Sequence, residues 1–284
     1  MRVRNRITSH IVNELDFFIR FLYCRLTFLK KLVFWNVYSS DFEQLDRSFE
    51  IMRSVFERHG ISIKGKTILE IGPGNSKITG YNLINHGAKE VVLLDKFPRF
   101  QNSKRQRKFQ DDELEFISRK YNLSKQNFSN GLLRSGNIRF LPCDLCDSDL
   151  VNVDIIISKS VLEHVKDIEA TIECMSKILG RGGYMYHNID LRDHYNFESP
   201  FLFYKYEEDI WNKYLTKEGV SYTNRLRYDE YMDLFKKHSF EVVSEDIVSQ
   251  DLGSVRLSPH FAHKRKGDLE VCTLRVLLRK PCSS

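Results

Sequence analysis

The most informative part of the sequence is Ile68-Leu69-Glu70-Ile71-Gly72-Pro73-Gly74. A short apolar run leads into an acidic residue and then a Gly-x-Gly turn, where glycine lets the chain turn tightly and lets a ligand approach the main chain. The run Val91-Val92-Leu93-Leu94 ends on Asp95, 21 residues after Gly74. A carboxylate at the end of such a strand can accept hydrogen bonds from both hydroxyls of a ribose. Together the two features predict a site for an adenosine-containing cofactor.

Outward from this stretch, short apolar runs alternate with helix-like segments. The predicted strands of the central region are 67–71, 91–95, 138–141, 154–158 and 184–189. Buried strands that alternate with helices predict a parallel sheet in an α/β fold. A helix at 229–238 and strands at 240–245 and 270–278 follow. Before the sheet, Ser40-Asp41-Phe42-Glu43 has the spacing of a capping box and predicts a helix that ends near Gly60.

The residues around the glycines indicate which adenosine cofactor fits. A dinucleotide fingerprint needs a third glycine three positions after Gly74, and that position is Lys77. The acidic Glu70 disfavours a pyrophosphate and suits a cationic amine. S-adenosylmethionine carries an amine and a sulfonium and no phosphate, so it is the predicted cofactor, and an NAD-dependent oxidoreductase is disfavoured.

At this point the chain resembles the class I S-adenosylmethionine-dependent methyltransferases, of the small-molecule or saccharide type with a generic methyltransferase domain. Residues 70–74 are similar to the motif that holds the methionine end of the cofactor, Asp95 to the ribose-binding acid, and residues 142–145 to the segment whose Asp contacts the adenine. The resemblance implies a Rossmann-like, seven-stranded α/β sheet whose last strand runs antiparallel beside the fifth. The cofactor-binding residues that it implies are Glu70, Gly72, Gly74, Asp95, Lys96, Asp144, Leu145 and Ser158. Asp144 as a simple turn or helix cap remains an alternative.

The fifth strand ends in a segment unusually rich in His and Asp, Tyr186-His187-Asn188-Ile189-Asp190-Leu191-Arg192-Asp193-His194. Methyl transfer to a hydroxyl needs a base, and a neutral His with a carboxylate behind it can serve near pH 7. His187, or His194 paired with Asp190 or Asp193, is the predicted base. Two alternatives stay open: a divalent metal ion held by Asp190, Asp193 and His194, and a polar loop bridged to Arg192. His164 and Glu163, in the segment Leu162-Glu163-His164-Val165, are interpreted as structural.

Residues 195–238 are rich in aromatic side chains and predict a substrate lid inserted after the fifth strand. Arg192, Tyr222, Arg225 and Arg227 are the predicted substrate-binding residues, because aromatic and guanidinium groups suit a sugar or another polar ring. The predicted function is O-methylation of a sugar or surface-polysaccharide glycan. The alternatives are N- or O-methylation of another small metabolite, and a non-catalytic scaffold of the same fold. The predicted segments are 1–60 (N-terminal helices), 61–194 (cofactor-binding core), 195–238 (lid) and 239–284 (C-terminal strands).

Charge and cysteine content bound the partners and the compartment. Residues 1–40 carry seven Lys/Arg and two Asp/Glu, which is +5 of the net charge of +6, so the body is nearly neutral and nucleic-acid binding is not expected. The six cysteines show no zinc spacing, and we expect reduced thiols in a cytoplasmic protein. Whether the chain forms a homo-oligomer is left open.

Residues 11–35 predict an amphipathic helix with two interpretations. Its apolar face comprises Ile11, Leu15, Phe18, Leu22, Leu26, Leu29 and Val33, and its polar stripe comprises Asn13, Asp16, Arg20, Cys24, Thr27 and Lys31. One interpretation is a helix that caps the core or a partner subunit. The other is peripheral association of residues 1–38 with the inner face of a membrane.

Overall fold

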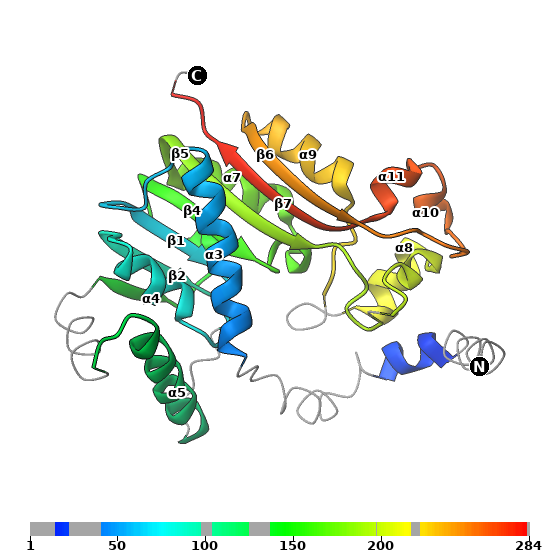
Figure 1. Cartoon of the computed structure of the whole chain (residues 1–284). Coiled ribbons are helices and arrows are strands. Elements are labelled where there is room, and N and C mark those ends of the chain that lie inside the picture. Colours follow the sequence, from blue (N-terminus) through cyan, green and yellow to red (C-terminus); the bar gives the residue numbers. More distant parts are fainter. Residues whose placement is uncertain are drawn as a thin grey trace.

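The computed structural model describes residues 15–22, 41–97, 104–124, 137–196, 198–216 and 222–282. These residues form a seven-stranded sheet in the order β3-β2-β1-β4-β5-β7-β6 (Figure 1). The strands are β1 (Thr67–Ile71), β2 (Glu90–Leu94), β3 (Ile138–Leu141), β4 (Val153–Lys159), β5 (Leu179–Asp190), β6 (Glu241–Ser249) and β7 (Val271–Arg279). β1 to β5 run parallel, and β7 runs antiparallel to both of its neighbours. The predicted α/β sheet, with its last strand antiparallel beside the fifth, is confirmed.

The strand boundaries differ most from the prediction at β5, which begins at Leu179 rather than at residue 184. The Gly-rich segment that resembles a turn continues the strand, with an irregular register against β4 between Val153 and Ile155. A Cβ atom on Gly183 would lie 2.9 Å from the Asp154 carbonyl oxygen and 2.8 Å from that of Gly180. Glycine is therefore needed here for a close approach of main chains.

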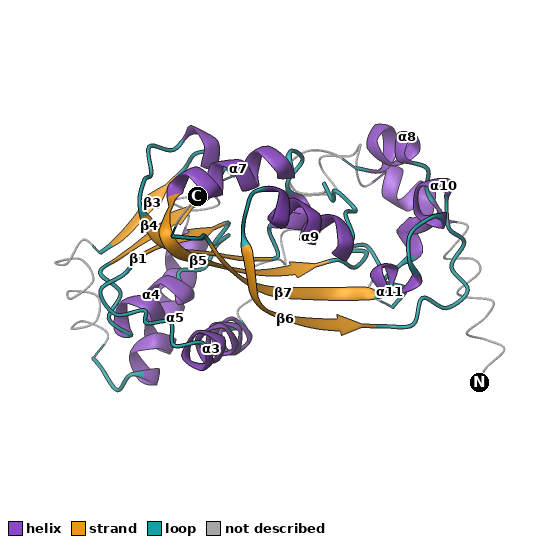
Figure 2. Cartoon of the chain, turned by 90° about the horizontal axis from the view of Figure 1, so that it is seen from above, coloured by secondary structure: helices purple, strands orange, loops and turns teal. Residues whose placement is uncertain are grey.

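Helices cover both faces of the sheet (Figure 2). On one face lie α3 (Phe42–Arg58) and α4 (Ile78–Asn85), with α5 (Lys104–Lys120) beside α4. On the other face lie α7 (Ile168–Ile178) and α9 (Tyr228–Lys237). Strand residues alternate between two apolar clusters, so Ile68 packs toward α3 while Leu69 packs toward α7. The apolar runs of β1 and β2 are explained by this burial on both faces.

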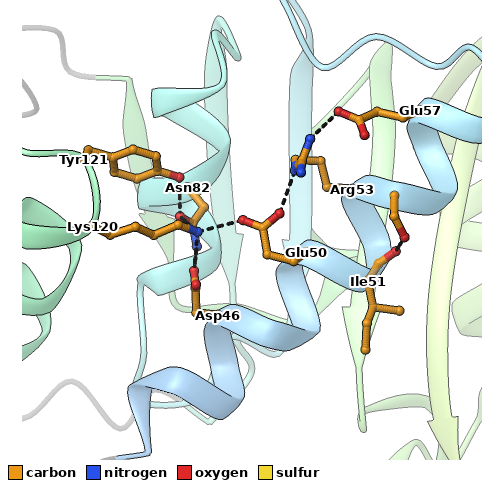
Figure 3. A network of polar contacts seen from close by, with 9 residues as sticks. Asp46, Glu50, Ile51, Arg53, Glu57, Asn82, Lys120 and Tyr121 are labelled. Carbon is orange, nitrogen blue, oxygen red and sulfur yellow. Dashed lines mark hydrogen bonds and ion pairs between the residues drawn. The ribbon is translucent and has the colours of Figure 1, made fainter.

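Helix α3 begins as the sequence predicts, although Asp41 provides the cap. Its side chain accepts a hydrogen bond of 2.8 Å from the Gln44 amide, while Ser40 lies outside the described residues. Phe49, Met52 and Phe56 are buried against the sheet. A polar network that includes Lys120 ties the outer face of α3 to α4 and α5 (Figure 3).

The aromatic residues after β5 form an apolar cluster of their own. The segment contains short helices at Leu202–Lys205, at α8 (Glu208–Ile210) and at Trp211–Leu215. Tyr204 and Trp211 pack with Phe261 and Leu269, which come from α10 (Pro259–Ala262) and α11 (Lys266–Leu269). Most of the segment that the sequence predicts as a lid therefore shares an apolar core with residues 250–270. The last part of that segment, α9, packs instead against the same face of the sheet as α7.

The structure also bears on the predictions for the cysteines and for the N-terminal helix. The prediction that the thiols are reduced is wrong for Cys146 and Cys174, which a disulfide joins with their Cα atoms 5.5 Å apart. The two sulfurs become neighbours only because the helical turn after β3 packs against α7.

Of the predicted N-terminal helix 11–35, residues 15–22 are helical and the rest lies outside the described residues. None of the described helices is long and apolar enough to cross a membrane.

Candidate active site

The Gly-x-Gly turn leaves β1 at the carboxyl edge of the sheet. Gly72 and Gly74 have φ values of +67° and +65°, a region that side chains disfavour. A Cβ atom on Gly72 would lie 2.6 Å from Cγ2 of Val161, so the turn passes directly beneath the loop after β4. The Gly72 amide donates a hydrogen bond of 2.8 Å to the Leu94 carbonyl, which fixes the turn against β2.

A cavity of about 340 Å³ opens beside this turn. It is lined by the ends of β1 and β2 and by the loops after β3 and β4, with Gly72, Asp95, Lys96, Asp144 and Leu145 among its residues. The Asp95 carboxylate accepts hydrogen bonds from the Gly74 amide at 3.3 Å and the Phe97 amide at 2.8 Å. These bonds hold the carboxylate at the cavity wall.

Asp144 lies in the same wall and also caps a helical turn. Its carboxylate accepts a hydrogen bond of 3.0 Å from the Cys146 amide and pairs with Nζ of Lys96 at 3.1 Å. Burial raises the pKa of Asp144, but the amide and the ammonium outweigh it and the pKa is lowered. The alternative interpretation as a cap is therefore correct, and it coexists with a place in the cavity.

A second cavity, of about 200 Å³, surrounds Glu70 and is also lined by Gly72. Ser158, Lys159 and Asn188 line it from β4 and β5, and Ser48 and Met52 line it from α3. Gly74 is the one predicted cofactor-binding residue that lines neither cavity; it acts through its bond to Asp95.

Glu70 is half-buried as a residue, and burial of its carboxyl raises the carboxyl pKa to about 8 despite a hydrogen bond from Thr79. Its Oε2 has no hydrogen-bond partner among the described residues. A buried carboxyl with an unused oxygen fits a cationic amine, and Asp95 fits a ribose. The two cavities meet at Gly72, so their residues fit S-adenosylmethionine.

The predicted bases occupy different environments. His187 has no exposed surface, and its Nδ1 lies 2.8 Å from Oγ of Ser158. Its ring stacks on Phe235 of α9, and burial lowers its pKa to about 3. Because His187 has no exposed surface and its ring lies against Phe235, this geometry gives it no path to an acceptor.

His194 lies closer than His187 to the cavity of about 340 Å³ that Asp95 and Asp144 line. Its Nε2 is 3.9 Å from Oδ2 of Asp190, and its ring centroid is 4.7 Å from that of His164, which lines that cavity. Burial is the largest influence on the His194 pKa and lowers it, although Asp190 opposes the shift. Arg192 also binds Asp190, with Nη2 2.7 Å from Oδ2, as the polar-loop interpretation expects.

The three predicted metal ligands are not brought together. Asp193 is buried and paired with Arg20, away from Asp190 and His194. The metal-ligand types that do converge are Glu163, His164 and His194, whose donor atoms all lie within 4.8 Å of one another. The prediction of an Asp190–Asp193–His194 metal site is therefore wrong in geometry.

Two of the predicted substrate-binding residues have structural contacts instead. Nη1 of Arg225 donates to the Phe203 and Tyr206 carbonyls at 3.2 and 2.8 Å. Nη1 of Arg227 donates at 2.7 Å to the Leu191 carbonyl, and Nη2 donates at 2.6 Å to the carbonyl of Val271. Both residues are buried, and both border a small cavity of about 10 Å³ together with Asp190 and Arg192.

The two other predicted substrate-binding residues, Tyr222 and Arg192, lie near the pair of histidines His164 and His194. The Tyr222 carbonyl accepts a hydrogen bond of 2.6 Å from Nδ1 of His164. Arg192 is half-buried and held by Asp190.

Sequence reasoning missed His164, Glu163, Lys159 and Asn188. His164 and Glu163 were interpreted as structural because one His in a helical turn is usually so. Lys159 ends β4 and Asn188 lies near the end of β5, and only the pairing of the two strands shows that these residues are neighbours.

The strand order, the Gly-x-Gly turn and the carboxylate at the end of β2 define a Rossmann-like class I methyltransferase. The family model of a methyltransferase domain matches residues 45–245, so the chain belongs to this family. It is an S-adenosylmethionine-dependent enzyme.

Solved structures share the fold at low identity. A putative sarcosine dimethylglycine methyltransferase from Galdieria sulphuraria is 15% identical, with a TM-score of 0.50 over 84% of this chain and 86% of that chain. The 1,6-didemethyltoxoflavin-N1-methyltransferase of Burkholderia thailandensis, solved with bound S-adenosylhomocysteine, is 11% identical, with a TM-score of 0.47 over 90% and 86%. No curated protein sequence matches the chain.

Proposed function

We propose that the enzyme methylates a hydroxyl group of a small polar acceptor, with saccharides as the favoured class. The observation that carries the proposal is the His194–Asp190 pair, in which the His194 imidazole contacts the ring of His164, a residue that lines the cofactor cavity. A hydroxyl is a poor nucleophile until its proton leaves, so a neutral imidazole next to a carboxylate is the group that this reaction needs.

In the proposed reaction, separate residues bind the cofactor and remove the acceptor proton. When bound, S-adenosylmethionine supplies an electrophilic methyl group on a sulfonium. Asp95 holds the ribose, Asp144 and Leu145 border the adenine, and Glu70 faces the amine of the methionine end. His194 takes the acceptor proton, and Asp190 stabilises the imidazolium that results.

The lining of the Glu70 cavity favours an acceptor rich in hydroxyl groups. Ser48, Thr79, Lys159 and Asn188 present hydrogen-bonding side chains around it. The lid aromatics give no support, because Phe203, Tyr204 and Trp211 are buried in their own cluster. The sugar class therefore depends on polar residues of the sheet edge and α3.

The acceptor is tested by incubating the enzyme and S-adenosylmethionine with nucleotide sugars, oligosaccharides and, for contrast, small amines. Mass spectrometry and fragmentation then locate any added methyl group. We expect a methyl ether on a sugar. Products methylated only on nitrogen would refute the hydroxyl acceptor.

The base is tested separately with His194→Gln and His187→Gln. We expect His194→Gln to lower turnover by about 100-fold or more while binding of S-adenosylhomocysteine persists. The acidic limb of the pH–rate profile should disappear with it. His187→Gln should keep that limb, because the His187 ring has no exposed surface from which to reach an acceptor. If a chelator abolishes activity and Mg²⁺ restores it, the histidines act through a metal and the base assignment fails.

A further inference from the structure

The helix at residues 15–22 is attached to the protein through its polar side. Asp16 and Arg20, one helical turn apart, are buried, and Nε of Arg20 lies 2.8 Å from Oδ2 of Asp16. The Arg20 guanidinium also pairs with buried Asp193 and lies over the Tyr195 ring, 4.8 Å from its centroid. Tyr206 donates a hydrogen bond of 2.7 Å to Asp16. Figure 1 shows this helix, in blue, beside the segment that carries α8.

This attachment turns an apolar face outward. Leu15 is 49% exposed, Phe18 56% and Ile19 54%. They are spaced three and four residues apart, so their side chains are neighbours on one face. Amphipathic helices normally bury such residues and expose the charged ones, and this helix does the reverse. A contiguous exposed apolar face of this kind marks an interaction surface.

The sequence around this face indicates what it contacts. Arg2, Arg4 and Arg6 precede the helix, and Arg25, Lys30 and Lys31 follow it closely. An apolar helix face flanked by basic residues matches an anionic bilayer, because one signal attaches a protein only weakly and two together attach it stably. A second copy of the chain fits less well, since a symmetric contact would place two basic segments against each other.

We propose that the outward face of Leu15, Phe18 and Ile19, with its basic flanks, docks the enzyme on an anionic lipid surface. The buried Arg20–Asp193 pair fixes the helix to the body, so docking sets the orientation of the catalytic domain. This inference is independent of the proposed acceptor, because it uses no residue of the active site.

The test is co-sedimentation of the full-length chain with vesicles of phosphatidylcholine, with or without phosphatidylserine. We expect binding only with phosphatidylserine, and added salt should weaken it. The double variant Phe18→Ser/Ile19→Ser should reduce binding by about tenfold or more, because two apolar side chains no longer leave water. Both residues are exposed, so the variant should fold and bind S-adenosylhomocysteine like the parent.

A matched control is Ile51→Ser on α3, which removes a helical side chain that is 44% exposed far from the docking face. It should bind vesicles like the parent. The proposal is overturned if the full-length chain stays in the supernatant with phosphatidylserine vesicles, or if the double variant sediments as the parent does. It is also overturned if the double variant converts a dimer to a monomer in analytical ultracentrifugation, because the face would then join two copies.

Discussion

At the scale of single residues, substitutions of Asp95 test whether its carboxylate binds the ribose of the cofactor. Its carboxylate accepts a hydrogen bond from the Gly74 amide, and in the proposed function it also binds the ribose. Asp95→Ala should lower the affinity for S-adenosylhomocysteine at least tenfold, because each charge-assisted hydrogen bond contributes about 1.5–3 kcal/mol. Calorimetry measures the affinity. Asp95→Asn, which keeps one acceptor oxygen, should lose less, and equal affinity in all three folded proteins would contradict the ribose assignment.

Glu70 gives a prediction about protons. Because burial raises its pKa to about 8, the carboxyl is mostly protonated at pH 7 in the free enzyme. A cationic amine favours the carboxylate, so cofactor binding at pH 7 should release up to about one proton. Titration calorimetry in buffers of different ionisation enthalpy measures this release.

Glu70→Gln supplies the control, since it should bind without that proton. The sign for stability follows from the same shift. A raised pKa in the folded state makes Glu70 stabilise the free enzyme below the ordinary carboxyl pKa, and this contribution is lost as the pH rises toward 8. The glutamine variant should lack that loss.

At the scale of elements, helix α3 joins the cavity to the outer helices. Its inner face lines the Glu70 cavity, and its outer face carries Asp46 and Glu50, which both bind Nζ of Lys120 at 2.7 Å (Figure 3). Lys120→Met should lower the free energy of unfolding by about 1 kcal/mol, because the two pairs are charge-assisted but partly exposed to solvent. Denaturant titration measures the change. Arg119→Met is the control: its pair with Glu115 is largely exposed, and such pairs contribute little.

The elements also show what the sequence could predict and where it stopped. β1 and β3 match their predicted ends because short apolar runs with turn residues on both sides are local signals. The structural contacts of Arg225 and Arg227 could not be predicted because their partners, such as the Phe203 and Val271 carbonyls, come from distant parts of the chain. Aromatic residues next to arginines look alike in sequence whether they line a cavity or fill a core.

At the scale of the whole molecule, one buried contact connects the N-terminal helix to the end of β5. Asp193 was a candidate ligand because its neighbours in sequence are Asp190 and His194. It faces Arg20 instead, 173 residues away in sequence. The periodicity of apolar residues cannot reveal such a pairing. The Arg20–Asp193 pair turns the polar side of the helix toward the body, whereas the apolar pattern of residues 11–35 favours a core-capping helix with its apolar side inward.

The Arg20–Asp193 contact makes a strong prediction about folding. Arg20→Met should lower the free energy of unfolding by about 3–5 kcal/mol, because it leaves the Asp193 charge buried without its cation. Adding Asp193→Asn should restore part of the loss. Arg47→Met is the control, since the Arg47–Glu43 pair is exposed and its removal should change little. Equal losses in the single and double variants would contradict the pairing.

The pH dependence of the same variant gives an independent check. Burial already raises the pKa of Asp193 although Arg20 opposes the shift, so removing Arg20 should raise it further. A folded-state pKa above the ordinary carboxyl value stabilises the fold at low pH and loses that contribution as the pH rises. The penalty of Arg20→Met should therefore be smallest in acid and grow toward neutral pH. In the double variant, where Asp16 is the remaining carboxylate that loses Arg20, it should grow less. Denaturant midpoints across that pH range measure both slopes. A penalty that does not change with pH would show that Asp193 is not the charge that Arg20 neutralises.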